Sequence, residues 1–224
     1  MVRRVFIPLV LFVILGIGGL VWLRSRDSAP AAASRSARVA AAAAPIIDKQ
    51  PPIVATRRFD PAAPLPEMPP LRAGEQAQCD SSFLSSAVVS GQPRRTGATT
   101  ATVTITQVKM TLQLVVTIWV PDGVTQHVLE HEEGHRQISE AYYQTADRLA
   151  ERIAASYMGR EFPVSGGDLD AEAGKTLQQA DEEITAEYNK QLNPEPAQLR
   201  FDEITDHARN DVLVRDAIAQ ALKE

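Results

Sequence analysis

The feature that most constrains the fold is a long stretch of alternating apolar residues that ends at the turn sequence PDG, residues 121–123. Alternation with a period of two places every second side chain on the same face of a β-strand. The apolar positions have odd numbers up to Ile105 and even numbers from Val108, so the phase changes at Gln107. We predict a strand over about residues 100–120 with a bulge or a break at Gln107.

Helical periodicity dominates the sequence after this turn. Apolar residues recur at steps near 3.6 up to about Met158, and Gly159 is typical of the end of a helix. Further helices are predicted over residues 168–191 and from Phe201 toward the C-terminus. The predicted fold class is therefore α+β, with a small antiparallel sheet packed on one long helix and on further helices.

The N-terminal part of the chain differs in composition from the rest. Residues 5–23 are uncharged and almost wholly apolar, and as a helix they would be roughly 28 Å long, enough to cross a bilayer. We predict a transmembrane anchor there, with a cleavable export signal as the alternative. Residues 24–75 are dense in Ala, Pro and Ser, which predicts a disordered linker, and residues 76–224 are the predicted folded domain.

These segments predict a single-pass protein of the bacterial inner membrane with its folded domain in the periplasm. The positive-inside rule alone favours the opposite orientation, because more arginines follow the apolar segment than precede it. The linker favours export, because a spacer of this composition holds a domain away from a bilayer.

Charge and cysteine content exclude two classes of function. The net charge is −5, from 23 basic and 28 acidic residues, so no basic surface is expected for nucleic acid, and we predict no such partner. Cys79 is the single cysteine, so neither an internal disulfide nor a thiolate zinc cluster can form. Any metal ion would have to be held by His, Glu and Asp side chains.

The segment HEEGH, residues 131–135, fits the pattern H-E-x-x-H. Two imidazoles one helical turn apart can bind one zinc ion, and the glutamate between them can take a proton from the metal-bound water. Both His131 and His135 fall on the apolar face of the predicted helix, where burial without partners would be costly. We predict that they are zinc ligands and that Glu132 is the general base; the alternative is a solvated, charged helix.

A third zinc ligand has to come from outside this segment. His127 is about 12 Å from His135 along the helix axis, and Glu140 is turned away from the two histidines. The candidates that remain are Asp181, Glu187 and His207.

Two segments together, HEEGHRQISEAYY from residue 131 and FDEITDH from residue 201, resemble a bacterial family of predicted secreted zinc-dependent proteases, the domain of unknown function 922. Its members pair a helix of the form HE-x-GH with a later segment YD-x-x-T-x-HG. The matching residues are His131, Glu132, Gly134, His135, Asp202, Thr205 and His207. Phe201 stands where the family has tyrosine, and Ala208 stands where it has glycine. The resemblance covers about residues 100–215 and favours His207 as the third ligand.

The resulting prediction is a zinc metallopeptidase that hydrolyses peptide bonds, with His131, His135 and His207 as zinc ligands and Glu132 as the base. Its partners would be a protein or peptide substrate and, through residues 5–23, the membrane. The alternative is a membrane-anchored, non-catalytic binding or assembly protein with a structural or vestigial metal site. A fourth protein ligand would favour that alternative, because a hydrolytic zinc ion keeps one position for water.

Overall fold

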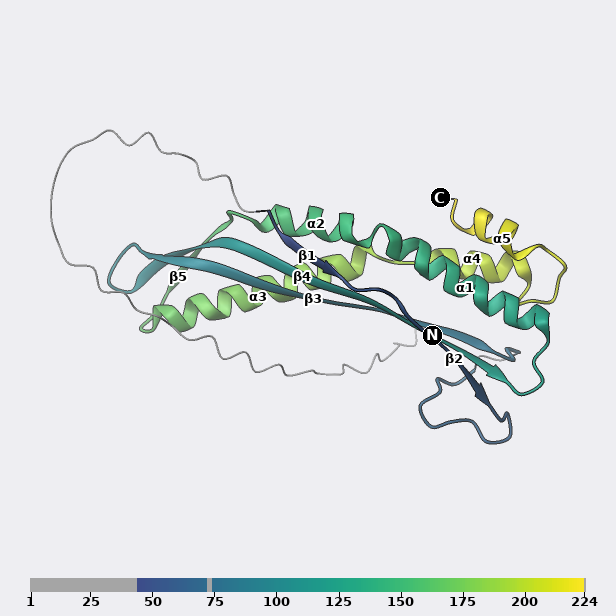
Figure 1. Ribbon diagram of the computed structural model, residues 1–224. Helices are drawn as coiled ribbons and strands as arrows, with labels where there is room; N and C mark the ends of the chain where they lie inside the picture. The colour runs from purple at the N-terminus through teal and green to yellow at the C-terminus, as the bar shows by residue number, and fades with distance from the viewer. Residues whose placement is uncertain (1–43, 72–73, 224) are drawn as a thin grey trace, which may run out of the picture. The chain divides into compact units, whose positions relative to one another are not determined.

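The computed structural model describes residues 44–71 and 74–223 (Figure 1). The strands are β1 (Ile46–Lys49), β2 (Ile53–Phe59), β3 (Gln78–Arg95), β4 (Thr100–Pro121) and β5 (Glu161–Ser165). The helices are α1 (Gln126–Gln144), α2 (Ala146–Tyr157), α3 (Leu169–Gln191), α4 (Glu195–Thr205) and α5 (Val214–Ala221). Within the described residues no helix has both the length and the apolar character that a membrane crossing needs, and the predicted anchor at 5–23 lies outside them.

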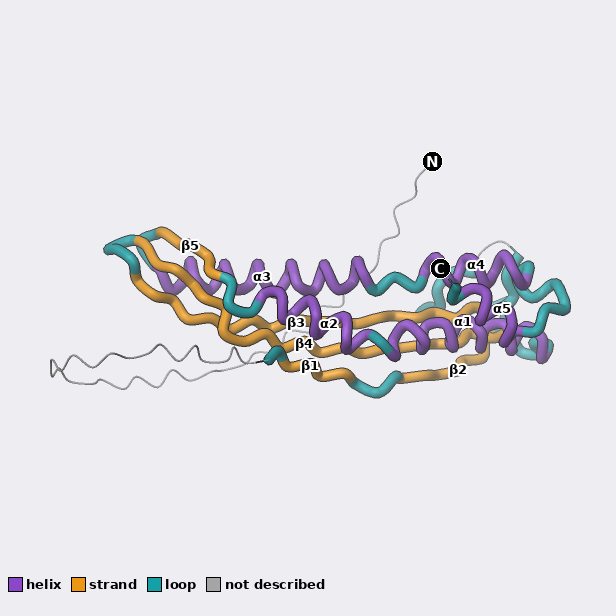
Figure 2. Tube along the Cα trace, turned by 90° about the horizontal axis from the view of Figure 1, so that it is seen from above, coloured by secondary structure: helices purple, strands orange, loops and turns teal. Residues whose placement is uncertain are grey.

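The strand β4 is the centre of a mixed five-stranded sheet. The long strand β3 pairs antiparallel along almost the whole of β4. The other edge of β4 is shared by three short strands in succession, antiparallel β5 and then parallel β1 and β2. Figures 1 and 2 show the helices α1, α2 and α3 running along the length of β3 and β4.

The prediction of an antiparallel sheet is therefore wrong, and so is the prediction of disorder for the part of the linker that forms β1 and β2. The strands β1 and β2 belong to the predicted linker, yet both are hydrogen-bonded to β4 and run parallel to it. They are edge strands, and from Ile53 to Arg58 every residue of β2 is exposed, so burial imposes no alternation that a sequence could show. The prolines between them, Pro51 and Pro52, lie at this edge, where a missing amide hydrogen breaks no ladder.

The alternation in β4 reflects burial on one face of the sheet. The even-numbered residues from Val108 to Val116 are fully buried, and their side chains form the centre of the main hydrophobic core. The register with β3 shifts between Ser90, which pairs with Gln107, and Gly91, which pairs with Ile105. Thr106 is thus the extra residue of a β-bulge, and the predicted bulge at the phase change is confirmed.

The helices α1, α2 and α3 pack on this buried face of the sheet. The segment predicted as one helix up to Met158 is divided at Thr145 into α1 and α2, and Tyr143, Ala150 and Ile153 join the same core. The helix predicted over residues 168–191 corresponds to α3. Hydrogen bonds from the β3 amides of Ala87 and Val89 to Thr185 and Asp181 tie α3 to the sheet.

The C-terminal region differs from its prediction. In place of one helix starting at Phe201 there are two, α4, which starts at Glu195, and α5, and both pack with α1 around a small separate core. Its buried members are Ile138, Ala197, Phe201, Ala217 and Ala221. This core holds one face of α4 against the histidine-bearing face of α1.

Candidate metal centre

The start of α1 is fixed directly after β4. Gly123 has a φ of 76° in the connecting turn, a conformation that favours glycine. The side chain of Thr125 then caps the helix by accepting a hydrogen bond of 3.3 Å from the amide of Val128. Less than two turns later, His131 and Glu132 are each only 5% exposed.

Three potential metal ligands converge between α1 and α4. They are His131 and His135 from α1 and Asp202 from α4, and one ligand atom from each lies within 4.8 Å of the other two. The Nε2 atoms of His131 and His135 are 3.2 Å apart. The Oδ1 atom of Asp202 is 3.3 Å from Nε2 of His131 and 2.9 Å from Nε2 of His135.

The other nitrogen of each imidazole also has a partner on α4. The Nδ1 atom of His135 is 2.5 Å from Oε1 of Gln198, and the Nδ1 atom of His131 is 3.2 Å from Oγ1 of Thr205. The ring of Phe201 stacks on His131 at a centroid distance of 5.0 Å and meets His135 edge to face at 4.9 Å. Both imidazoles are therefore held in fixed orientations.

Burial and the carboxylate shift the pKa values of these groups in different directions. Burial lowers the pKa of His131. Burial also acts to lower the pKa of His135, but the hydrogen bond and the charge of Asp202 outweigh it, and the net pKa is raised. For Asp202 burial acts to raise the pKa, but the close contacts with the two histidines hold it well below its usual range. Asp202 is thus an anion at neutral pH, as a metal ligand has to be.

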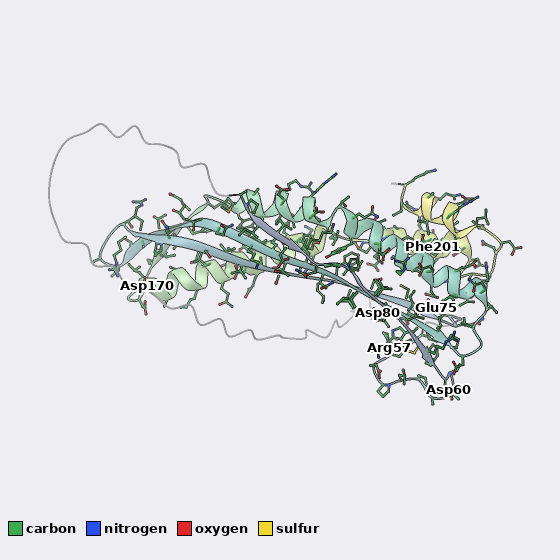
Figure 3. All side chains as sticks on the ribbon, viewed as in Figure 1. Arg57, Asp60, Glu75, Asp80, Asp170 and Phe201 are labelled. Carbon is green, nitrogen blue, oxygen red and sulfur yellow. The ribbon has the colours of Figure 1, made fainter. Side chains whose placement is uncertain are left out.

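Glu132 lies beside this group and faces the strand β3. Burial raises its pKa to about 7, while a hydrogen bond from the backbone amide of Cys79 acts in the opposite direction. The charges of Asp202 and Glu75 add to the increase. Figure 3 shows Glu75 below α1, at the same end of the sheet as Phe201. A carboxylate whose pKa lies near neutrality is suited to exchange protons.

His207, the predicted third ligand, lies next to this group and outside it. Its Nδ1 atom is 3.6 Å from Oδ1 of Asp202, and its side chain is 41% exposed. It follows the end of α4 in a run of three residues with positive φ, Asp206, His207 and Ala208. Ala208 has a φ of 63°, so glycine, the residue of the resembled family, would be favoured at this position.

The other candidates lie outside the group as well. The carboxylate of Asp181 accepts the hydrogen bond from the amide of Val89, and that of Glu187 accepts one from Gln191 on the same helix. Glu140, excluded by its helical phase, forms an ion pair with Arg136. None of these belongs to the potential metal-ligand group that the described residues contain.

Asp202 was not predicted as a ligand, although it belongs to the second matching segment. The sequence contains a pattern that points to Asp202. One helix face with the spacing i, i+4, i+7 would carry Gln198, Asp202 and Thr205. It was missed because the helix was predicted to start at Phe201, which leaves Gln198 outside it.

The side chains fit a divalent transition metal. Two imidazole nitrogens and a carboxylate oxygen form a donor set typical of zinc in hydrolytic sites, and three protein ligands leave one tetrahedral position open. The partners on Nδ1 supply the outer hydrogen bonds that metal-binding histidines usually have. No family model, curated protein or solved structure matches the chain. The family resemblance therefore stays a prediction.

Proposed function

We propose that this protein is a zinc-dependent metallopeptidase in which His131, His135 and Asp202 hold the metal ion and Glu132 is the general base. The observation that carries the proposal is the convergence of Asp202 from α4 on the two histidines of HEEGH, within 4.8 Å. In a solvated polar helix these three groups would be exposed, because burying polar groups costs free energy unless they are paired. The resemblance to the secreted protease family adds the peptide bond as substrate.

In this proposal each residue has a separate task. A bound zinc ion supplies Lewis acidity, which polarises the substrate carbonyl and makes water more acidic. Glu132 accepts the proton of the attacking water and then donates it to the leaving amine. The burial of Glu132 and its pKa of about 7 suit both transfers, since a group with this pKa can hold and release a proton near neutral pH.

We propose Asp202 in place of His207 as the third ligand, because Asp202 contacts both histidines while His207 contacts only Asp202 in the described hydrogen bonds and ion pairs. Elemental analysis of the full-length chain tests this directly. About one zinc per chain is expected in the wild type and in His207→Ala, and none in His131→Ala and Asp202→Ala. Loss of zinc in His207→Ala with retention in Asp202→Ala would reverse the assignment.

Activity is tested by hydrolysis of fluorescently labelled casein. Glu132→Gln should keep its zinc and lose about 10²- to 10⁴-fold in rate, because the amide cannot accept the proton. Glu130→Gln is the matched control, since Glu130 is exposed on the same helix and should tolerate the change. Retained hydrolysis in Glu132→Gln would exclude Glu132 as the base. A zinc-loaded wild type that cleaves neither casein nor peptide mixtures would favour the non-catalytic alternative.

A further inference from the structure

The two imidazoles contact each other, and within the described residues all their other hydrogen-bond and ion-pair partners come from one face of α4. Asp202 faces both Nε2 atoms, while Gln198 and Thr205 face the Nδ1 atoms of His135 and His131. The hydrogen-bonding capacity of Gln198 and Thr205 determines which ring nitrogen carries a hydrogen.

The amide of Gln198 is oriented by its other contacts. Its Nε2 atom is 3.0 Å from the carbonyl oxygen of His135 and 2.9 Å from Oγ of Ser139. A carbonyl oxygen can only accept, so the amide nitrogen has to face it, and the amide oxygen is left for Nδ1 of His135. Since an amide oxygen can only accept, Nδ1 of His135 has to be the donor.

The position of Ser139 supports this orientation. Ser139 is fully buried, and its hydroxyl donates either to Oγ of Ser81 on β3, at 2.9 Å, or to the carbonyl of His135, at 3.1 Å. In both cases the lone pairs of its oxygen are available to the amide of Gln198. The amide is therefore held against α1 by a backbone carbonyl and by Ser139, and neither of these groups is a metal-ligand atom.

The hydroxyl of Thr205 acts in the same way on His131. Its single hydrogen has an acceptor in the helix, the carbonyl oxygen of Phe201 at 2.8 Å. The oxygen is then the acceptor for His131, whose Nδ1 lies 3.2 Å away and therefore carries a hydrogen. Both rings thus have Nδ1 as donor and direct Nε2 toward Asp202.

We propose that Gln198 and Thr205 are positioning residues that hold His135 and His131 with the hydrogen on Nδ1, so that both Nε2 lone pairs and Asp202 are directed at one cation. In the neutral rings no hydrogen lies between these three acceptors, so a metal ion or an added proton has to occupy the space between them. The helix α4 then supplies one ligand and orients the other two. This inference rests on the proposed metal site.

The test is the zinc dissociation constant of the full-length chain, measured by competition with a chromophoric chelator. Gln198→Leu removes the acceptor. Thr205→Val removes the hydroxyl at constant shape, and Thr205→Ser restores it. We expect zinc binding to weaken by about 10- to 100-fold in Gln198→Leu and Thr205→Val, and wild-type affinity in Thr205→Ser. Gln179→Leu is the control, because Gln179 is an exposed helical glutamine whose described hydrogen bond is to Glu183.

A second readout separates orientation from general damage. In ¹⁵N-labelled, zinc-loaded wild type, both imidazoles should show a slowly exchanging Nδ1 hydrogen, and Thr205→Val should lose the signal of His131 while that of His135 stays. Unchanged zinc affinity in folded Gln198→Leu and Thr205→Val would overturn the inference and leave the metal site in place. If Gln198→Leu does not fold, equal affinities in Thr205→Val and Thr205→Ser would overturn it. Absence of zinc binding by the wild type would overturn this inference together with the proposed function.

Discussion

Gly134 of α1 packs directly against Phe201 of α4, so the effect of replacing it by alanine follows from the geometry. A Cβ atom added at Gly134 would lie 2.4 Å from Cζ of Phe201 and 3.1 Å from Cγ1 of Val214. Ordinary contact begins near 3.4 Å, so the ring would have to retreat by about 1 Å. Phe201 has no exposed surface and therefore no open space into which it could move.

Two opposing contributions determine how much Gly134→Ala changes the free energy of unfolding. Alanine gains up to about 1 kcal/mol of helix propensity over glycine. Overpacking of a buried site costs about 1–3 kcal/mol, and a rigid aromatic ring places the cost in the upper part of this range. We therefore expect the free energy of unfolding to fall by about 1–2 kcal/mol, or Tm to fall by about 2–8 °C in a chain of this size.

Gly174 provides the matched control. It lies within α3, is exposed, and an added Cβ would meet nothing within 4 Å. Only the propensity term applies there, so Gly174→Ala should raise the free energy of unfolding by about 0.5–1 kcal/mol. Both variants replace a helical glycine by alanine, but their predicted effects on the free energy of unfolding have opposite signs.

Urea unfolding followed by circular dichroism measures both effects. Phe201→Leu, which shortens the clashing side chain, should reduce the loss caused by Gly134→Ala, and a double-mutant cycle gives the coupling energy. Zinc affinity should also fall in Gly134→Ala, because Asp202 follows Phe201 on α4. A Gly134→Ala protein as stable as Gly174→Ala would refute the close packing of α1 on α4.

Two further predictions concern the turn after α4 and the contact between α3 and β3. Ala208→Gly should raise the free energy of unfolding by about 0.5–1 kcal/mol, because glycine removes the strain of a φ of 63°; a lower Tm in a thermal melt would contradict this. Burial raises the pKa of Asp181 to about 6, so between about pH 4 and pH 6 the folded protein holds a proton that the unfolded chain has released. Stability should fall as pH rises through this window, and Asp181→Asn, which keeps an acceptor for Val89, should remove that part of the fall. Equal changes in unfolding free energy between pH 4.5 and pH 7.5 for wild type and Asp181→Asn would exclude this effect.

The sequence predicted those parts of the structure that a local pattern specifies. The alternation around Val108 gave β4 with its bulge, because one face of that strand is buried against helices. The spacing of His131 and His135 placed their rings together, because residues four apart on a helix share a face. The strands β1 and β2 showed no such pattern, because they are short edge strands: the side chains of β2 are exposed up to Arg58, and those of β1 are at most half-buried.

The residues of the site also differ in how far the sequence alone predicts them. The histidines and the glutamate of the site could be named from HEEGH alone, since their relation is set by the geometry of one helix. The third member of the group could not, because Asp202 is 67 residues from His135 in sequence and meets it only where α4 packs on α1. That packing depends on the contact of the Phe201 side chain with the backbone of Gly134. A contact of this kind produces no periodic pattern in the sequence. Local spacing therefore determined which imidazoles face inward, and the tertiary structure alone decided which carboxylate faces them.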